Sequence, residues 1–374
     1  MKNFLKILFV CFFGLTSFAQ QATEIDSKSV RLPRYTNLTA IQAAITSPQQ
    51  GMMVYNVGTA TNWYYNGSNW TNLATATSAP TEAEGFGSWA CSNASLIAYQ
   101  PVGNFNGQIY NYFGISVAIS GVYAIVGANS DNEGFVGGSA TIFKRNSGTG
   151  VWESQGKLTN PNPANSDLFG SSVAISGEYA IVGAYGDDEG IGLTNNGSAT
   201  IFKRNSGTGV WESQGKLTNP SAANSDLFGV SVAISGDYAI VGAYFDDELG
   251  FTENGSATIF KRNSGTGVWE SQGKLTNPSA ANSDLFGYSV AISGDYAIVG
   301  ARSDDEGFTD NGSATIYRRY GNVWRNLPKT SDPSAANYDY FGASVAIDGS
   351  TARFLIGAFG SSSYKGLAVF GQVK

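Results

Sequence analysis

Three short acidic runs are the residues of this chain whose types and spacing could do chemistry. Each run has two aspartates and a glutamate and lies just after a Gly-Ala pair, in a loop rich in glycine and asparagine. The runs are Asp187-Asp188-Glu189, Asp246-Asp247-Glu248 and Asp304-Asp305-Glu306, and Asp131 and Glu133 form a weaker version upstream. Carboxylate oxygens clustered with loop carbonyls are the hard ligands that Ca²⁺ prefers. A calcium site in these loops, with Asp226 as a further ligand, is one interpretation.

Two other interpretations of the acidic runs remain open. The loops can recognise a sugar or a protein without a metal ion, or the acids can form a solvated rim that keeps the protein soluble. Tyr185 and Tyr244 lie beside two of the runs and are candidate ligand-binding residues. One tryptophan recurs at the same point of each unit, which favours packing over sugar stacking; these are Trp152, Trp211, Trp269 and Trp324.

The composition excludes several classes of function. The chain contains no histidine, so neither a Ser-His-Asp nor a Cys-His nucleophile pair can form, and the commonest zinc and copper ligand is missing. Charged residues make up 14 % of the chain and the net charge is −7. Because binding to a phosphate backbone requires a basic face, nucleic acid is not an expected partner. Carboxylate chemistry and calcium binding stay compatible with this composition.

The elements that carry the acidic runs belong to a unit that recurs about every 58 residues. Each unit starts with Phe-Gly followed by Ser-Val-Ala-Ile, continues through an apolar stretch to Gly-Ala, and then has the acidic loop and a Gly-Ser-Ala-Thr-Ile-Phe stretch or a variant of it. The anchors begin at Phe113, Phe169, Phe228, Phe286 and Phe341. Such a period indicates stacked copies of one supersecondary unit that cannot bury its apolar faces alone.

Each unit predicts four strands, which in the third unit cover 231–234, 238–243, 256–262 and 268–275. The first two strands show no polar alternation, so we expect both faces of the sheet to be covered, as in a radial blade. The acidic loops and the aspartates before the Phe-Gly anchors should then share one face of the ring. We predict an all-β propeller of about five four-stranded blades over 85–374, the segment 89–99 completing the last blade. The alternative is incomplete closure, with further blades supplied by a second chain.

The Phe-Gly anchor and the Gly-Ala end of the apolar stretch resemble the FG-GAP repeat of integrin α-chain propellers, and more closely its bacterial secreted version. The resemblance covers all five units and implies a β-propeller. Two features differ from the integrin pattern. The proline of Gly-Ala-Pro is absent, and the loop between the first two strands, Gly236-Asp237 in the third unit, is too short for the calcium-binding Asp-x-Asp-x-Asp-Gly motif. The calcium ligands of the family therefore have no counterpart here.

The N-terminal part is a separate region. Residues 1–19 read as a secretory signal peptide, with Lys2 and Lys6 before a short apolar stretch, which predicts an exported, extracellular or surface location without a membrane span. Residues 20–75 predict a small α+β module, with a helix capped by Thr36-Asn37 and strands near 52–55 and 62–65. The module resembles one found near the N-termini of exported bacterial surface and fibre-like proteins, and it can hold copies together. Residues 76–84 are a predicted linker.

These features favour a protein that binds rather than catalyses. The acidic loops repeat almost evenly, which suits multivalent weak binding to a glycan or protein ligand, calcium-dependent or not. Two rivals remain. A carboxylate-only glycoside hydrolase or polysaccharide lyase can use paired acids on a propeller. A structural or assembly protein would oligomerise through the N-terminal module and carry the propeller as an inert head.

Overall fold

The computed structural model describes residues 34–48, 52–56, 61–65, 68–72, 111–131, 137–361 and 365–373. The chain divides into two compact units, Met1–Tyr99 and Gln100–Lys374. The predicted signal peptide, the predicted linker, the segment 89–99 and Glu133 lie outside the described residues. Within the described part of the chain, no helix has the length and apolar character that crossing a membrane requires.

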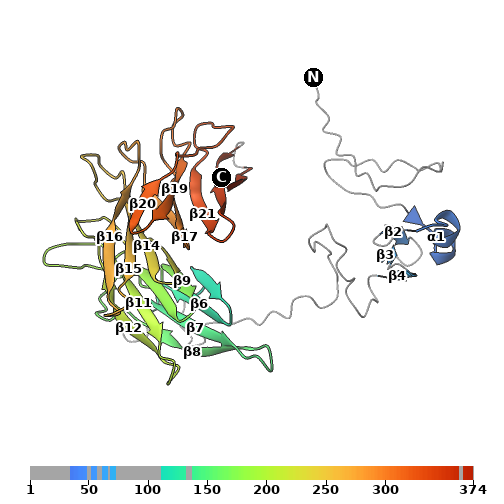
Figure 1. Ribbon diagram of the computed structural model, residues 1–374, viewed down its shortest axis with the longest axis horizontal. Helices are drawn as coiled ribbons and strands as arrows, with labels where there is room; N and C mark the ends of the chain where they lie inside the picture. Colours follow the sequence, from blue (N-terminus) through green and yellow to red (C-terminus); the bar gives the residue numbers. More distant parts are fainter. Residues whose placement is uncertain are drawn as a thin grey trace. The chain divides into compact units, whose positions relative to one another are not determined.

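The N-terminal unit is a four-stranded sheet with one helix (Figure 1). Its elements are β1 (Arg34–Tyr35), α1 (Leu38–Ala44), β2 (Met53–Asn56), β3 (Thr61–Tyr65) and β4 (Trp70–Asn72), with β1 parallel to β2 and the other pairs antiparallel. The side chain of Asn37 caps the helix by accepting a hydrogen bond from the Ala40 N–H at 2.9 Å. Ile41, Val54 and Trp70 form the buried core. This is the predicted α+β module.

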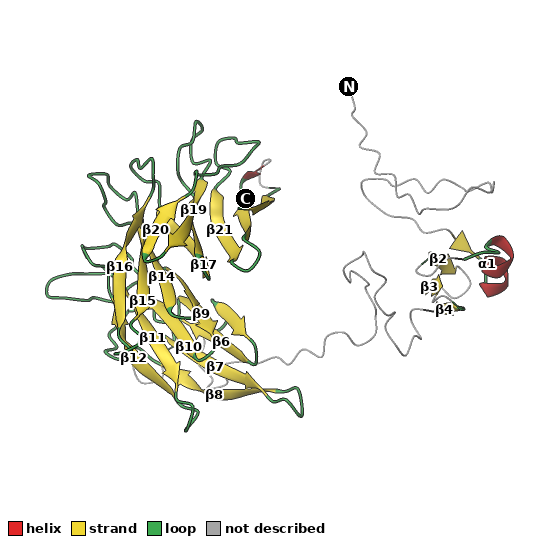
Figure 2. Cartoon of the chain, viewed as in Figure 1, coloured by secondary structure: helices red, strands yellow, loops and turns green. Residues whose placement is uncertain are grey.

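The second unit consists of five antiparallel sheets, each made from one repeat (Figure 2). Four have four strands: β5 (Val117–Ser120), β6 (Tyr123–Ala128), β7 (Ser139–Arg145) and β8 (Trp152–Leu158); β9 (Ser172–Ser176), β10 (Tyr179–Ala184), β11 (Ser198–Arg204) and β12 (Trp211–Leu217); β13 (Ser231–Ser235), β14 (Tyr238–Ala243), β15 (Ser256–Arg262) and β16 (Trp269–Thr276); β17 (Phe286–Ser293), β18 (Tyr296–Ala301), β19 (Ser313–Tyr320) and β20 (Val323–Asn326). The fifth has three: β21 (Phe341–Asp348), β22 (Arg353–Ala358) and β23 (Leu367–Gln372).

Both faces of the central strands are buried, as the missing polar alternation predicted. Ile240 and Val241 are adjacent in β14, so they point to opposite faces, and neither is accessible to solvent. The blades approach each other so closely that only glycine fits at one point of each. A Cβ added to Gly242 would collide with the carbonyl oxygen of Gly287 in the next blade. The Gly of Gly-Ala is therefore a packing requirement of the propeller.

Successive blades share apolar cores. Phe169, Phe228, Phe286 and Phe341, the anchor residues of the second to fifth repeats, are fully buried. Trp211 packs edge-on against Tyr123 of the preceding blade at 5.7 Å between ring centroids, and Trp269 against Tyr179 at 5.8 Å. The packing role predicted for the repeated tryptophans is thus confirmed for these residues. Among the described strands, the first and fifth blades do not pack on each other as neighbouring blades do.

Candidate functional site

The first aspartate of each acidic run is buried and paired with a lysine. In the third blade, the Oδ2 atom of Asp246 accepts a hydrogen bond from the Ser256 hydroxyl at 2.5 Å and contacts the Lys274 Nζ at 2.5 Å. Lys274 also contacts Glu248 and donates to the Ser221 hydroxyl at 2.6 Å. The first, second and fourth blades repeat the ion pair, as Lys157–Asp131, Lys216–Asp187 with Glu189, and Lys329–Asp304 with Glu306.

The second aspartate of each run holds its own loop in place. The Oδ1 atom of Asp247 accepts a hydrogen bond from the Glu253 N–H at 2.7 Å. Asp188 accepts in the same way from Asn195, and Asp305 from Asp310, both at 2.7 Å. The three acids of a run therefore have different tasks: the first and third bind the lysine, and the second closes the loop.

The aspartate before each Phe-Gly anchor lies next to this network. Asp226 is 1 % exposed and accepts hydrogen bonds from the Ala223 N–H at 2.7 Å and the Asn219 amide at 2.8 Å. Burial, and to a lesser degree the nearby Asp246, raise the pKa of Asp226 to about 6 despite the lowering effect of the hydrogen bonds and of Lys274. Asp167 and Asp284 have the same environment, and burial raises the pKa of each to about 6.

The arrangement around the acidic runs does not fit a calcium ion. Calcium needs several carboxylate and carbonyl oxygens directed at one point. In the third blade, the point where the carboxylates of Asp246 and Glu248 converge is taken by the ammonium group of Lys274. Over the described ranges, no three acidic or thiol side chains gather in a way that could hold a metal ion. Of the residues predicted as metal ligands, the first and third acid of each run are brought together around a lysine, and the second acid binds an N–H group of its own loop instead.

The two tyrosines predicted as ligand-binding residues lie elsewhere, at the start of a row of aromatic side chains. Tyr185 and Tyr244 directly follow β10 and β14. The ring of Tyr244 lies 5.6 Å from that of Tyr288, at the start of the next blade. Burial raises the pKa of Tyr244, the nearby Tyr288 and Tyr185 raise it further and Arg302 lowers it, so these three groups lie within electrostatic range of Tyr244.

Arg302 connects the two halves of the row. Its guanidinium carbon lies 4.1 Å from the ring centroid of Tyr288 and 6.0 Å from that of Tyr340, and its Nη1 donates to the Tyr288 hydroxyl at 3.3 Å. Such cation–π contacts fix the guanidinium against the rings. The buried Nε of Arg302 has no hydrogen-bond partner among the described residues.

The row ends in the fifth blade. Tyr340 stacks on Phe359 with the centroids 4.9 Å apart and an interplanar angle of 17°, and Tyr338 lies 6.4 Å from Tyr340. Phe359 and Tyr338 are about half exposed. We call this set the aromatic row; its members are Tyr185, Tyr244, Tyr288, Arg302, Tyr338, Tyr340 and Phe359. It runs from the second blade to the fifth along the side that carries the acidic loops.

The row offers ring faces, phenol hydroxyls and one cation. Flat ring faces pack on the apolar face of a sugar or on apolar side chains, and the hydroxyls and guanidinium supply hydrogen bonds. Arg302 forms no ion pair with a carboxylate in the part of the chain that the structure describes, whereas the loop lysines Lys216, Lys274 and Lys329 are each paired with a carboxylate. The row is therefore suited to binding, with Arg302 as its polar anchor.

Sequence reasoning missed five members of the row, which are Tyr288, Arg302, Tyr338, Tyr340 and Phe359. The signal was available, since Arg302 and Phe359 occupy the position after Gly-Ala that Tyr185 and Tyr244 occupy in their own repeats. Tyr288 and Tyr340 flank the Phe-Gly anchors of later repeats. What the sequence lacks is the contact between neighbouring blades that brings these two positions together.

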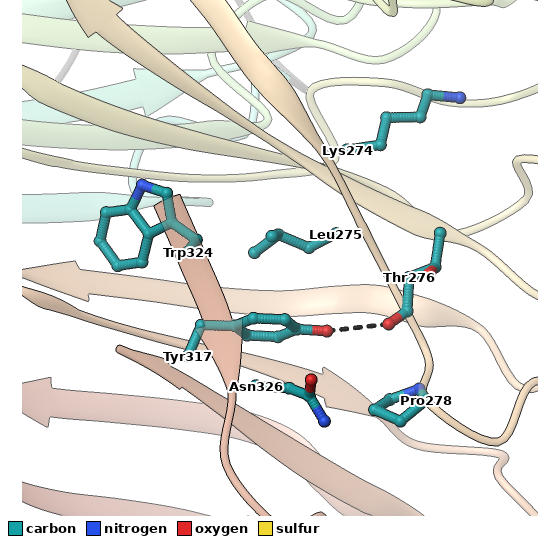
Figure 3. A pocket seen from close by; sticks show the side chains of 7 residues that line it. All are labelled: Lys274, Leu275, Thr276, Pro278, Tyr317, Trp324 and Asn326. Atoms are coloured by element: carbon teal, nitrogen blue, oxygen red, sulfur yellow. Dashed lines mark hydrogen bonds between the residues drawn. The ribbon is translucent and has the colours of Figure 1, made fainter. Parts of the chain in front are cut away.

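A second feature is a notch of about 210 Å³ between the third and fourth blades (Figure 3). Tyr317 extends along it and donates a hydrogen bond to the Thr276 carbonyl at 2.8 Å, with Trp324 and Pro278 nearby. The notch is smaller than the roughly 300 Å³ at which ligand pockets begin. It therefore adds nothing to the candidate site.

Radial four-stranded blades with shared cores define this protein as a β-propeller. A family model described as FG-GAP repeat matches residues 106–143, 152–202, 211–260 and 269–317, which together make up half of the chain. The chain therefore belongs to the FG-GAP repeat family, as its motifs predicted. A second model, described as a phage tail like trimerisation region, matches residues 20–87.

No curated protein matches the chain. Among solved structures, the chain is similar to a candidate 6-phosphogluconolactonase from Bacteroides fragilis, with 9 % sequence identity and a TM-score of 0.44, over 84 % of this chain and 77 % of the other.

Proposed function

We propose that this protein is an exported, surface-associated adhesion or recognition protein whose propeller binds a glycan through the aromatic row. The observation that carries the proposal is the continuous contact of Tyr244, Tyr288 and Arg302 with Tyr340 and Phe359 across three blades. A row of rings with one guanidinium fits a chain of sugar units better than a compact small molecule. The signal-peptide pattern of residues 1–19 supports export.

Several observations support binding over catalysis. The acids whose pKa is raised to about 6 are Asp167, Asp226 and Asp284, and these pKa values would suit a general acid. All three are buried and bonded to backbone and amide groups of their own loops. A carboxylate in that position cannot reach a glycosidic oxygen. Polysaccharide cleavage by the wild-type protein, lost in an Asp226→Asn variant, would overturn this part of the proposal.

The N-terminal match supports a multivalent form of the proposal. If residues 20–87 hold three chains together, three aromatic rows are presented at once, and weak single contacts add up through their effective concentration. The same match is also compatible with the hypothesis of an assembly protein in which the propeller is an inert head. The two are distinguished by whether the propeller binds anything.

The test is glycan binding by the full chain and two single variants. A glycan array identifies the ligand, and titration calorimetry measures Kd for wild type, Tyr244→Ala and Arg302→Gln. Because side chains central to a contact contribute most of its energy, we expect each variant to raise Kd about tenfold or more. Tyr320→Ala is the matched control, since Tyr320 is half exposed at the end of β19, outside the row. No glycan ligand, or equal losses in Tyr244→Ala and the control, would refute the proposal; a protein ligand lost in Tyr244→Ala alone would keep the site but change its ligand.

A further inference from the structure

Each contact between neighbouring blades is built from the same two faces. We call the side of a blade that meets the preceding blade its leading face, and the other side its trailing face. At the fourth contact, the trailing side chains Ile298, Ala314 and Ile316 form one core with Val345, Ile347 and Ile356 on the leading face of the fifth blade. The chain holds four such contacts in sequence. Among the described residues, the leading face of the first blade and the trailing face of the fifth blade have no matching face.

The leading face of the first blade is apolar and exposed. Val117 and Ile119 are 69 % and 66 % exposed. Their counterparts in the second blade, Val173 and Ile175, are 8 % and 7 % exposed because the first blade covers them. The first blade therefore carries the side chains of a contact but has no neighbour for them among the described residues.

The trailing face of the fifth blade is likewise apolar and exposed. Phe370 is 79 % exposed, although its counterpart in the fourth blade, Ile316, is only 5 % exposed. Ala346 and Ala368 beside it are also exposed. An aromatic residue has replaced isoleucine where the repeat normally meets its next copy.

The polar parts of the contact are also present at both ends. In each of the four contacts, a serine hydroxyl of one blade donates to the carbonyl of the anchor glycine in the next blade at 2.7 Å; the serines are Ser116, Ser172, Ser231 and Ser289. The fifth blade keeps this serine as Ser344, which is exposed. The first blade keeps the accepting glycine, Gly114.

Gly357 gives the strongest sign that the trailing face has a partner. Its counterparts Gly183, Gly242 and Gly300 cannot carry a Cβ because the anchor glycine of the next blade would collide with it. A Cβ on Gly357 meets only the Ser344 side chain of its own blade. The fifth blade differs from the others at many positions, with Arg353 and Phe354 in place of Tyr-Ala, yet it retains a glycine that its own packing does not need.

We propose that the trailing face of the fifth blade docks on the leading face of the first blade of a second copy of this chain. The contact would repeat the four internal ones, with Ser344 donating to the partner's Gly114 carbonyl. The Phe-Gly-x-Ser-Val-Ala-Ile anchor of a leading face does not recur in the printed sequence outside the described residues. Because the two faces differ, the contact is head-to-tail and not isologous, so it produces closed rings or open filaments.

Two variants block the contact from opposite sides without touching the internal packing. Gly357→Ala places a methyl group against the partner's anchor, and within its own chain only the flexible Ser344 side chain must move. Ile119→Arg places a charge on the leading face at a position that tolerates it because it is exposed. The matched controls are Gly265→Ala and Val268→Arg, in an exposed turn of the third blade where a Cβ has room.

Sedimentation velocity of the full chain measures the outcome. We expect wild type and both controls to form larger species as concentration rises, and each blocking variant to lose them. A mixture of Gly357→Ala and Ile119→Arg chains should regain a single contact, because one variant retains the leading face and the other the trailing face. A mixture of two differently tagged Ile119→Arg chains is the control. Both chains lack a functional leading face, so any species that contains both tags must form through the N-terminal region.

The proposal fails if wild type and the blocking variants sediment alike at every concentration, which would mean that this chain covers its own faces. It also fails if Val268→Arg disrupts association as strongly as Ile119→Arg, or if the two blocking variants do not complement each other. None of these three results bears on glycan binding, since the residues of the aromatic row are unchanged in these variants.

Discussion

The lysine at the centre of each acidic run should be a major source of stability, and Lys274→Met is the sharpest test. The side chains of Lys274, Asp246 and Glu248 are 13 %, 2 % and 20 % exposed, so little water can replace the lysine. Removing one partner of a buried ion pair costs about 3–5 kcal/mol because the other charge is left uncompensated. The partial exposure of Lys274 and Glu248 lowers this to about 2–4 kcal/mol.

A second estimate gives the upper limit of the loss of unfolding free energy in Lys274→Met. The variant can relieve the stranded charge by protonating an aspartate, which for an ordinary pKa near ~3.9 costs about 4 kcal/mol at pH 7 but under ~2 kcal/mol at pH 5. We therefore expect Lys274→Met to lose about 2–4 kcal/mol of unfolding free energy at pH 7 and clearly less at pH 5. Urea unfolding followed by tryptophan fluorescence measures both values.

The control for this experiment is Lys365→Met, which removes the same charge from an exposed position in the fifth blade. We expect it to change the unfolding free energy by less than about 0.5 kcal/mol. A loss below about 1 kcal/mol in Lys274→Met at pH 7 would show that the lysine does not compensate the carboxylates. A loss of equal size at both pH values would show that no stranded carboxylate is involved.

Two further predictions concern the same network. Asp226 has a pKa raised from 3.8 to about 6 on folding, so its contribution to stability, up to about 3 kcal/mol, is present below about pH 4 and lost as pH rises through 6. The unfolding free energy of Asp226→Asn should therefore fall less between pH 4 and pH 7 than that of wild type, and parallel pH curves would contradict this. Calcium at millimolar concentration should leave the melting temperature of wild type unchanged, because Lys274 occupies the convergence point of the carboxylates. A rise that disappears in an Asp246→Asn/Asp247→Asn variant would restore the calcium interpretation.

The fold could be predicted from the sequence because the information is repeated and local. The Phe-Gly anchor, for example at Phe228, begins every unit. The apolar strands on both sides of Gly236-Asp237 predict a hairpin with a two-residue turn, which the structure contains. The tryptophans could be placed for the same reason, since a residue at the same point of every blade must meet its neighbour in the same way.

The role of the acidic runs could not be predicted, because it depends on a residue far away in the sequence. Lys274 comes 28 residues after Asp246 and reaches it only because β15 and β16 pair with Thr258 opposite Lys274. The fourth blade shows that this pairing is specific. Its outer strand has a different sequence, yet Lys329 contacts Asp304 and Glu306 as its counterparts do.

Some repeat positions have the same residue type from blade to blade and others vary, and this difference separates positions that stabilise the blades from candidate binding positions. The ion pair between a lysine and a buried aspartate uses the same residue types in the first four blades, as expected of a device that stabilises the loop of each of these blades. The position after Gly-Ala differs, with asparagine, two tyrosines, arginine and phenylalanine in chain order. A surface that holds a ligand in one orientation requires a single polar anchor, and identical blades cannot provide one. In the proposed glycan site, Arg302 is that anchor because the repeat is broken there, so the irregular position after Gly-Ala is more informative about ligand binding than the repeated acids.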